Sequence, residues 1–284
     1  MSAVERRPVV KGTSLTLTNQ SQQAFQATGA VLNIAAKGLS AAAKLAFAGV
    51  QQTIALTKTV IKSANELRTT AQSMQQQSIA ISRQHGLSET EAHQVAGLAI
   101  ASSYIVNDPQ VLTQAMQALQ NNPSANTLES VQASLESAHQ QFFVENISLA
   151  VSKAAMQIGF SSIPAVATAM VNGKVCLTAS DDTGRVLVTE IHSDRNHQIS
   201  IATEIIGSSD HTCNQILDAF HTALESEGVK MGDRDRKFTG GIIELDAARE
   251  FVSRKMKPKA KSAQTAARKS AARPTAKKSQ VQKF

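Results

Sequence analysis

The stretch FFVENISLAVSKAAMQIGFSSIPAVATAMVNGKVCLTAS, residues 142 to 180, changes its hydrophobic period in the middle. Up to Gly159 the apolar residues follow helical spacing, and Gly159 itself is a typical stop at the C-terminus of a helix. After Pro164 apolar and polar residues alternate, and Asn172-Gly173 is typical of a two-residue hairpin turn. The stretch therefore predicts an α+β protein in which helices precede a sheet.

Upstream of this change, the spacing predicts a long helix from Thr127 to Ile158 whose apolar stripe shifts by one residue after Phe142. Two shorter helices come before it. Ser88 and Glu91 match a capping box at the start of one, and Asp108-Pro109 places an N-cap and an N1 proline at the start of the other.

The segment from Asn19 to Arg83 contains no Pro and repeats apolar residues every seven positions. Seven of nine such positions are large and apolar, which is typical of one long helix that packs along a seam. We predict a long-helix bundle or a coiled-coil-like helical hairpin over residues 19–160. We also expect the seam to make the protein a homo-oligomer, through Phe25, Leu32, Leu39, Val60, Leu67 and Met74.

Downstream, the alternation predicts a four-stranded antiparallel β-meander, ending with strands at Arg185 to His192 and Gln198 to Ile206. A helix follows from Ser209 or Asp210 to Gly228, and a last short helix runs from about Ile243 to Lys255. Residues 162–253 are therefore predicted to be a small α+β domain with one or two covering helices, which docks to an unidentified protein partner.

The last 33 residues, from Val252 to Phe284, contain eleven Lys or Arg and no acidic residue. Subtracting these eleven charges from the net charge of +7 leaves residues 1 to 251 at −4. This segment contains too few large apolar residues to offset the entropy that it would lose on ordering. We therefore predict a disordered tail over 254–284, and we also predict a flexible N-terminus over 1–18. The cations expected to bind nucleic acid or another polyanion are Arg254, Lys255, Lys257, Lys259, Lys261, Arg268, Lys269, Arg273, Lys277 and Lys278.

Cysteine use and hydropathy indicate a soluble, cytoplasmic protein. The chain has only two cysteines, Cys176 and Cys213. Its longest charge-free apolar stretch, Leu45 to Thr57, is too short to span a bilayer, and no apolar segment typical of a secretion signal follows the N-terminus.

Three patterns in the sequence are candidate sites of chemistry. Cys213 lies on the apolar stripe of its helix and is predicted to be a core residue; the alternative is an enzyme in which His211 or His221 activates its thiolate. Asp182-Thr-Gly184 matches the aspartic-protease triplet but occurs once, between strands, so we predict a turn. Gly240-Gly241 predicts a connector, the alternative being an anion site. We expect no catalytic residue, no cofactor and no metal.

The first helical segment also has large apolar residues off its seam, among them Ile34, Phe47, Ile54 and Ile61. A bundle explains them, and so does an amphipathic helix on a lipid or polymer surface with Lys37, Lys44 and Lys58 on its polar side. The Ala- and Gln-rich composition of residues 20 to 160, with the Lys- and Ala-rich tail, resembles the phasins. That resemblance implies a coat protein of storage granules, covers composition only and leaves out residues 162–253.

Taken together, these patterns predict a non-enzymatic interaction or scaffold protein that self-associates through long helices and binds nucleic acid or another polyanion through its tail. The alternatives are the surface coat protein and the cysteine-dependent enzyme.

Overall fold

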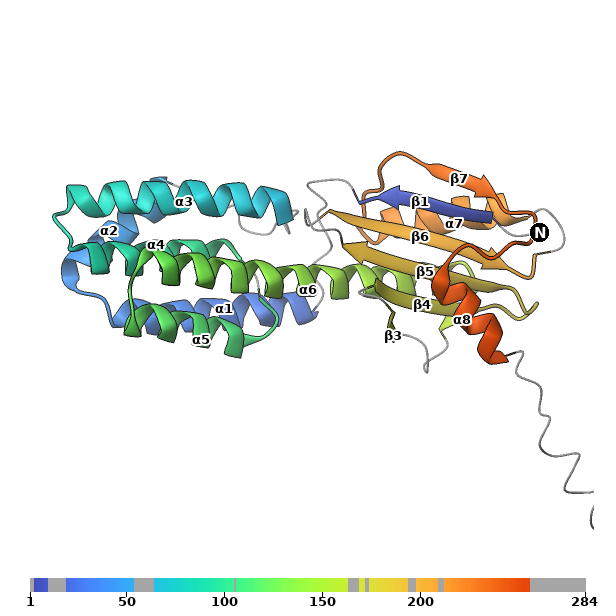
Figure 1. Cartoon of the computed structure of the whole chain (residues 1–284), viewed down its shortest axis with the longest axis horizontal. Coiled ribbons are helices and arrows are strands. Elements are labelled where there is room, and N and C mark those ends of the chain that lie inside the picture. The colour runs from blue at the N-terminus through green and yellow to red at the C-terminus, as the bar shows by residue number, and fades with distance from the viewer. Residues whose placement is uncertain are drawn as a thin grey trace, which may run out of the picture. The chain divides into compact units, whose positions relative to one another are not determined.

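The structure is a computed structural model that describes residues 3–9, 19–53, 64–104, 106–162, 169–171, 174–193, 198–208 and 212–255 (Figure 1). One compact unit runs from Met1 to Ala248 and a second from Arg249 to Phe284. Of the second unit, only the end of α8 (Asp246–Lys255) is described. The first unit combines helices with an antiparallel sheet, which confirms the α+β class.

The helical part places α4 (Glu89–Ser103) at its centre. Around α4 lie α1 (Asn19–Lys37), α2 (Ala41–Thr53), α3 (Ala64–Gln84), α5 (Pro109–Asn121) and the first half of α6 (Ala125–Gln157) (Figure 1). Every α4 residue from Val95 to Ala101 is buried. Gly97 allows α5 to come close, because a Cβ at this position would overlap the side chain of Leu119.

The single helix predicted from Asn19 to Arg83 is wrong. α1 ends at Lys37, and the chain turns through Gly38, Leu39 and Ser40 before α2 begins. The Ser40 hydroxyl accepts the backbone N–H of Ala43 at 3.2 Å, as an N-cap does. The Gly-Leu-Ser triplet is thus a stop followed by a cap, and the heptad repeat runs across it. Val60 lies outside the described residues.

The starts predicted for the two middle helices and the stop of the long helix are confirmed, whereas α8 begins at Asp246 and not near Ile243, and the start predicted at Ser209 or Asp210 lies outside the described residues. Ser88 and Glu91 form a complete capping box at the start of α4. Asp108 caps α5 through the N–H of Gln110, with Pro109 in the first turn. The long helix α6 has 33 residues, and Gly159 follows it with a φ of 87°.

The sheet has the strand order β2-β4-β5-β6-β1-β7, with β3 paired to β4 beside β2. The strands are β1 (Ala3–Pro8), β2 (Ser161–Ser162), β3 (Ala169–Val171), β4 (Lys174–Ser180), β5 (Val186–Ser193), β6 (Ile199–Ile206) and β7 (Asp235–Phe238). All described pairs are antiparallel. The predicted meander is therefore present as β3 to β6, while the Asn172-Gly173 turn lies outside the described residues.

The flexible N-terminus predicted over 1–18 is wrong for residues 3–8, which form β1. This strand lies between β6 and β7 and pairs with both, Glu5 facing Thr203 on one side and Arg236 on the other. Its partners lie about 200 positions away in the sequence, so no local pattern reports the pairing. It follows that residues 162–253 alone lack one inner strand of the sheet.

Two hydrophobic cores meet along α6. Leu128, Val131 and Leu135 belong to the core of the helices, whereas Ile147 and Val151 belong to the core under the sheet. The second core also contains residues of α7 (Cys213–Ser226), so α6 and α7 cover the same face of the sheet. The shift of the apolar stripe along α6 marks the point at which the helix leaves one core for the other.

No helix within the described ranges is both long enough and apolar enough to cross a membrane.

Candidate functional site

Most of the predicted polyanion-binding residues lie beyond the described part of the chain. Arg254 and Lys255 close α8, although their side chains are not described, and the cations from Lys257 onward lie outside the described residues. The segment that leads into them, Glu244 to Ala247, is described in full.

Glu204 of β6 holds the start of this segment. Its side chain is completely buried, with 0% of its surface exposed. The carboxylate accepts the backbone N–H of Glu244 at 3.1 and 3.2 Å and that of Leu245 at 2.9 Å. A buried carboxylate is costly unless it is well hydrogen-bonded, and here backbone donors supply those bonds.

Glu190 of β5 holds the first turn of α8. Only 3% of its surface is exposed. One oxygen accepts the backbone N–H of Ala247 at 3.1 Å, and the other accepts a bond from Lys174 Nζ at 2.9 Å. The first N–H groups of a helix have no partner inside it, and a negative charge near them is favourable. Glu190 thus caps α8 from a neighbouring strand.

The sheet register brings the two glutamates together. Thr189 lies opposite Thr203 in the register of β5 and β6. Glu190 and Glu204 each come one residue later, so both point to the other face of the sheet, where they are diagonal neighbours. We name the pair the carboxylate clamp. Both carboxylates already bond backbone N–H groups and both are buried, so the clamp is suited to fixing the chain before the tail and leaves no access for a substrate.

A second buried carboxylate, Glu5 of β1, lies on the opposite face of the sheet, under α7. It is 1% exposed and pairs with the Nε and Nη2 atoms of Arg236 of β7. Arg7 Nε and His221 Nδ1 each approach Glu5 Oε1 to 3.0 Å, without the alignment of a good hydrogen bond. Arg236 also bonds Asp218 of α7 at 2.9 Å. This Glu5 network joins the N-terminal strand to α7 and β7.

The chemistry of His221 follows from that network. Burial, together with the positive charges of Arg7, Arg234 and Arg236, lowers the pKa of His221 from 6.5 to about 4. The negative charge of Asp218 works in the opposite direction and is outweighed. His221 is consequently neutral at pH 7 and serves as a packed, polar neighbour of Glu5.

The geometry separates the residues of the enzyme alternative. Cys213 is the first residue of α7 and is buried in the core under the sheet. His221 comes eight residues later in the same helix, which at 1.5 Å per residue is a distance of about 12 Å. His211 lies outside the described residues. Among the residues that the structure describes, no group of three or more His, Cys, Asp or Glu can hold a metal ion.

The predicted self-association residues are used inside the chain. Leu39, Leu67 and Met74 are buried in the core of the helices, and Leu32 packs against it half-buried. The Phe25 side chain is not described. These side chains contribute to packing within the chain, and their part in self-association stays a prediction.

The glycine-containing loops are turns. Asp181 accepts the N–H groups of Thr183 and Arg185 between β4 and β5, and Gly184 has a φ of 85°, which confirms the predicted turn at Asp182-Thr-Gly184. Gly240 and Gly241 also have positive φ, in the exposed connection between β7 and α8.

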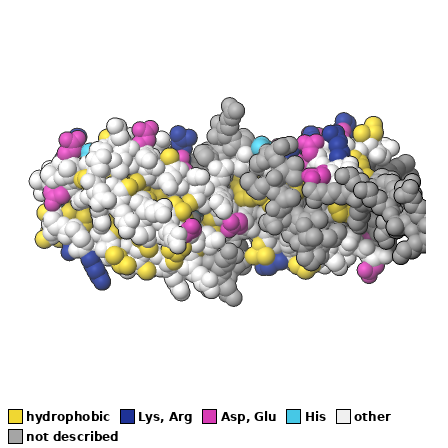
Figure 2. Space-filling view, turned by 60° about the horizontal axis from the view of Figure 1, so that its bottom comes forward, with side chains coloured by type: hydrophobic (Ala, Val, Ile, Leu, Met, Phe, Trp, Pro, Cys, Tyr) yellow, Lys and Arg dark blue, Asp and Glu magenta, His cyan; other side chains and the backbone are white. Residues whose placement is uncertain are grey.

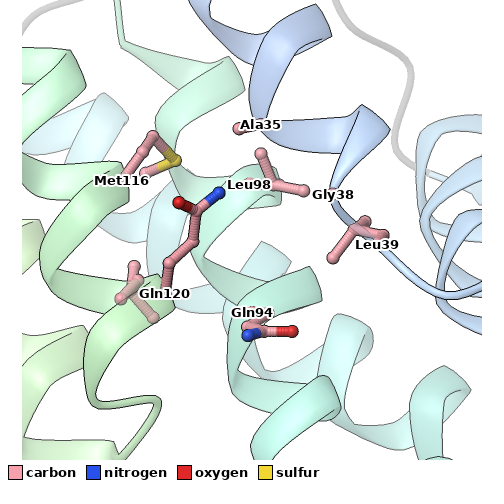
Figure 3. Close-up of a pocket in the computed structure, with 8 residues that line it drawn as sticks. Ala35, Gly38, Leu39, Gln94, Leu98, Met116 and Gln120 are labelled. Atoms are coloured by element: carbon pink, nitrogen blue, oxygen red, sulfur yellow. The ribbon is translucent and has the colours of Figure 1, made fainter.

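A hollow lies between α1, α4 and α5, where Ala35, Leu98 and Met116 form its walls and Gln94 and Gln120 lie beside it (Figure 3). Its volume is about 30 Å³, enough for roughly two water molecules. The hollow is too small for an organic ligand.

No protein-family model, no curated protein and no solved structure matches this chain.

Neither the carboxylate clamp nor the Glu5 network was predicted from the sequence. A signal for the clamp was present: the triplet Thr-Glu-Ile occurs at residues 189–191 and again at 203–205, and each copy puts a charge in the middle of an apolar strand. Glu5 had no such signal, because Glu-Arg-Arg-Pro at an N-terminus is typical of a solvated end.

Proposed function

We propose that this protein is a non-enzymatic interaction protein that binds nucleic acid, as a polyanion, through the basic tail at residues 254–284. The observation that carries the proposal is the charge of that segment: eleven Lys or Arg between Val252 and Phe284, and no Asp or Glu. Each cation that meets a phosphate releases condensed counterions, which favours binding without regard to sequence.

The composition of the tail supports non-specific contact. Small residues separate the clusters of charge, and Phe284 is the only aromatic residue after Phe251. Proteins that bind single strands gain much of their affinity from the stacking of bases on aromatic rings. The tail has one such ring, so stacking contributes little. Phosphates are the expected target, in DNA and RNA alike.

The body supports the proposal in two ways. Residues 1 to 251 carry a net charge of −4, so non-specific attraction to nucleic acid belongs to the tail. The carboxylate clamp fixes the backbone from Glu244 to Ala247, which precedes the tail in sequence. A folded part with an acidic balance does not compete with the tail for phosphates.

Salt titration of a labelled random-sequence duplex by fluorescence anisotropy tests the proposal. If the full chain engages about six to eight phosphates, its affinity falls by roughly a thousandfold or more between 50 and 200 mM salt. A full-length variant with all eleven tail cations changed to Gln loses nearly all binding at 50 mM salt. A second variant keeps the tail composition and scrambles its order, and it binds as well as the natural chain.

Equal binding by the neutral-tail variant would place the affinity elsewhere and contradict the proposal. A strong loss in the scrambled variant would show that order matters, against charge-driven recognition.

A further inference from the structure

The strand β7 forms one edge of the sheet. It is the last strand in the order β2-β4-β5-β6-β1-β7, and among the described strands it pairs only with β1 (Figure 1). An edge strand presents a row of backbone N–H and C=O groups that no neighbouring strand of its own sheet uses, and such a row can pair with a strand of another chain. β7 is therefore a place where a second chain can extend the sheet.

Contacts with the rest of the sheet hold this edge in its extended form. Arg236 pairs with Glu5 of β1 and donates to Asp218 of α7 at 2.9 Å. Just upstream, the backbone N–H of Gly232 donates to the Pro8 carbonyl at 2.7 Å. A strand that is already ordered loses little conformational freedom when another strand pairs with it.

One face of β7 carries both signs of charge. Asp235 and Lys237 lie opposite Arg6 and Val4 of β1, so both point to the side of the sheet that carries the carboxylate clamp. Both are exposed. Lys237 keeps 68% of its side chain exposed while it pairs with Glu244, and within the described residues Asp235 forms no ion pair. Figure 2 shows basic and acidic side chains next to one another on the part of the chain that contains the sheet.

Two-fold symmetry limits how two copies of β7 can pair. When identical edge strands pair antiparallel and their sheets become continuous, the two-fold axis is perpendicular to the sheet, and one residue faces its own copy across the axis. With the axis at Asp235 two aspartates would face each other, and with the axis at Lys237 two lysines would. With the axis at Arg236, Asp235 of each copy lies opposite Lys237 of the other. The two central arginines are tolerated there because each already pairs with Glu5 of its own chain.

We propose that β7 pairs antiparallel with β7 of a second copy of this chain, with Arg236 at the two-fold axis, so that the two sheets become one. Two Asp235–Lys237 pairs then form between the copies, and Phe238 of each copy lies opposite Arg234 of the other. Opposite charges that face each other across strands stabilise the pairing, and a guanidinium packs favourably on an aromatic ring. Phe238 is 57% exposed in one chain, and this contact covers it.

The proposed interface is small. Stable protein interfaces bury about 800 Å² on each side, which is more than one short strand and its side chains provide. We therefore expect a weak dimer, with a dissociation constant between roughly 10 µM and 1 mM. Sedimentation equilibrium of the nuclease-treated full-length chain measures it, in about 0.15 M salt so that repulsion between the basic tails is screened. A chain that stays monomeric up to about 1 mM overturns the proposal.

Charge reversal tests the register. Asp235→Lys sets lysine against lysine and Lys237→Asp sets aspartate against aspartate, so each variant alone should dimerise at least about tenfold more weakly. A mixture of the two variants has both opposite-charge pairs again and should dimerise like the natural chain.

Asp233→Lys is the matched control, because it makes the same change at an exposed position that precedes the paired strand. It should dimerise like the natural chain. An equal loss in this control, or no recovery in the mixture when circular dichroism shows both variants folded, contradicts the proposed register.

Cysteine cross-linking tests the register without reversing any charge. Residues directly opposite each other in antiparallel strands have Cα atoms about 4.5–5.5 Å apart, which a disulfide can bridge. Asp235→Cys mixed with Lys237→Cys should cross-link under mild oxidation, whereas neither variant alone should, because identical positions lie out of register. The natural cysteines, Cys176 and Cys213, are buried. If the mixture does not cross-link, or if either variant cross-links equally well alone, β7 does not pair in this way. Nucleic-acid binding by the tail is measured separately, so either proposal can fail alone.

Discussion

The two cores of the folded body satisfy their buried polar groups over very different distances. Among the helices, the Thr28 hydroxyl donates to the Ala24 carbonyl at 2.9 Å and the Ser82 hydroxyl to the Ser78 carbonyl at 2.6 Å, each four residues back. Around the sheet, Glu5 pairs with Arg236, which lies 231 positions away. These buried hydroxyl groups of the helices therefore find their acceptors within the same helix, whereas the buried carboxylate of the sheet finds its partner at a distant position in the sequence.

This difference makes the Glu5 network the most sensitive point of the molecule. Glu5→Gln removes the negative charge between Arg7 and Arg236 and leaves both guanidinium groups poorly compensated in a buried place. Breaking one side of a buried ion pair costs about 3–5 kcal/mol, so we expect a loss of that size in urea unfolding followed by circular dichroism.

The exposed Glu129 of α6 provides the control for that substitution, and Glu129→Gln should stay within about 0.5 kcal/mol of the parent. A cost below about 1 kcal/mol for Glu5→Gln would show that the distant contacts of the sheet matter less than its hydrophobic packing.

A matched pair on α6 asks whether the cores unfold together. Leu135 and Ile147 are both fully buried, one in each core, three turns apart on the same helix. Leu135→Ala and Ile147→Ala should each cost about 2–5 kcal/mol. Because α6 belongs to both cores, we expect a single unfolding transition in each variant, by circular dichroism at 222 nm and by hydrogen exchange of the β4 to β6 amides. Two separate transitions would show that α6 does not couple the cores.

The same contrast explains what the sequence could predict. The caps at Ser88 and Asp108, the stop at Gly159 and the meander from β4 to β6 each depend on neighbours within a few residues or one hairpin, and all were predictable. The break at Gly38 was also local, but a heptad repeat that continued across it concealed the signal.

The strand β1 and the partners of Glu5 could not be predicted from the sequence, for a different reason. Alternation and turn residues identify a strand only where the chain folds back on itself nearby, and β1 pairs with strands some 200 positions away. The carboxylate clamp lies between these cases, since its repeated Thr-Glu-Ile triplet was visible but its role needed the register of β5 and β6.

Acid should weaken the sheet core through His221. Its pKa is lowered from 6.5 to about 4 in the folded protein, so the unfolded chain binds a proton more readily. The stability that the neutral ring provides is complete above pH 6.5 and is lost as the pH falls toward 4, by up to roughly 3 kcal/mol. His221→Gln should flatten the unfolding free energy over this pH window. If the natural chain and the variant lose stability in parallel between pH 6.5 and 4, His221 is not the group responsible.

The smallest loss of stability is expected where a buried polar group is hydrogen-bonded within its own helix. Ser82 is fully buried in α3 and donates to the Ser78 carbonyl. Ser82→Ala removes the donor together with its need for a partner, and the carbonyl still accepts from within the helix, so the net loss should stay below about 1 kcal/mol. Urea unfolding beside Glu5→Gln measures the contrast directly. A cost for Ser82→Ala that approached the cost at Glu5 would mean that local hydrogen bonds hold the helical core as tightly as the long-range network holds the sheet.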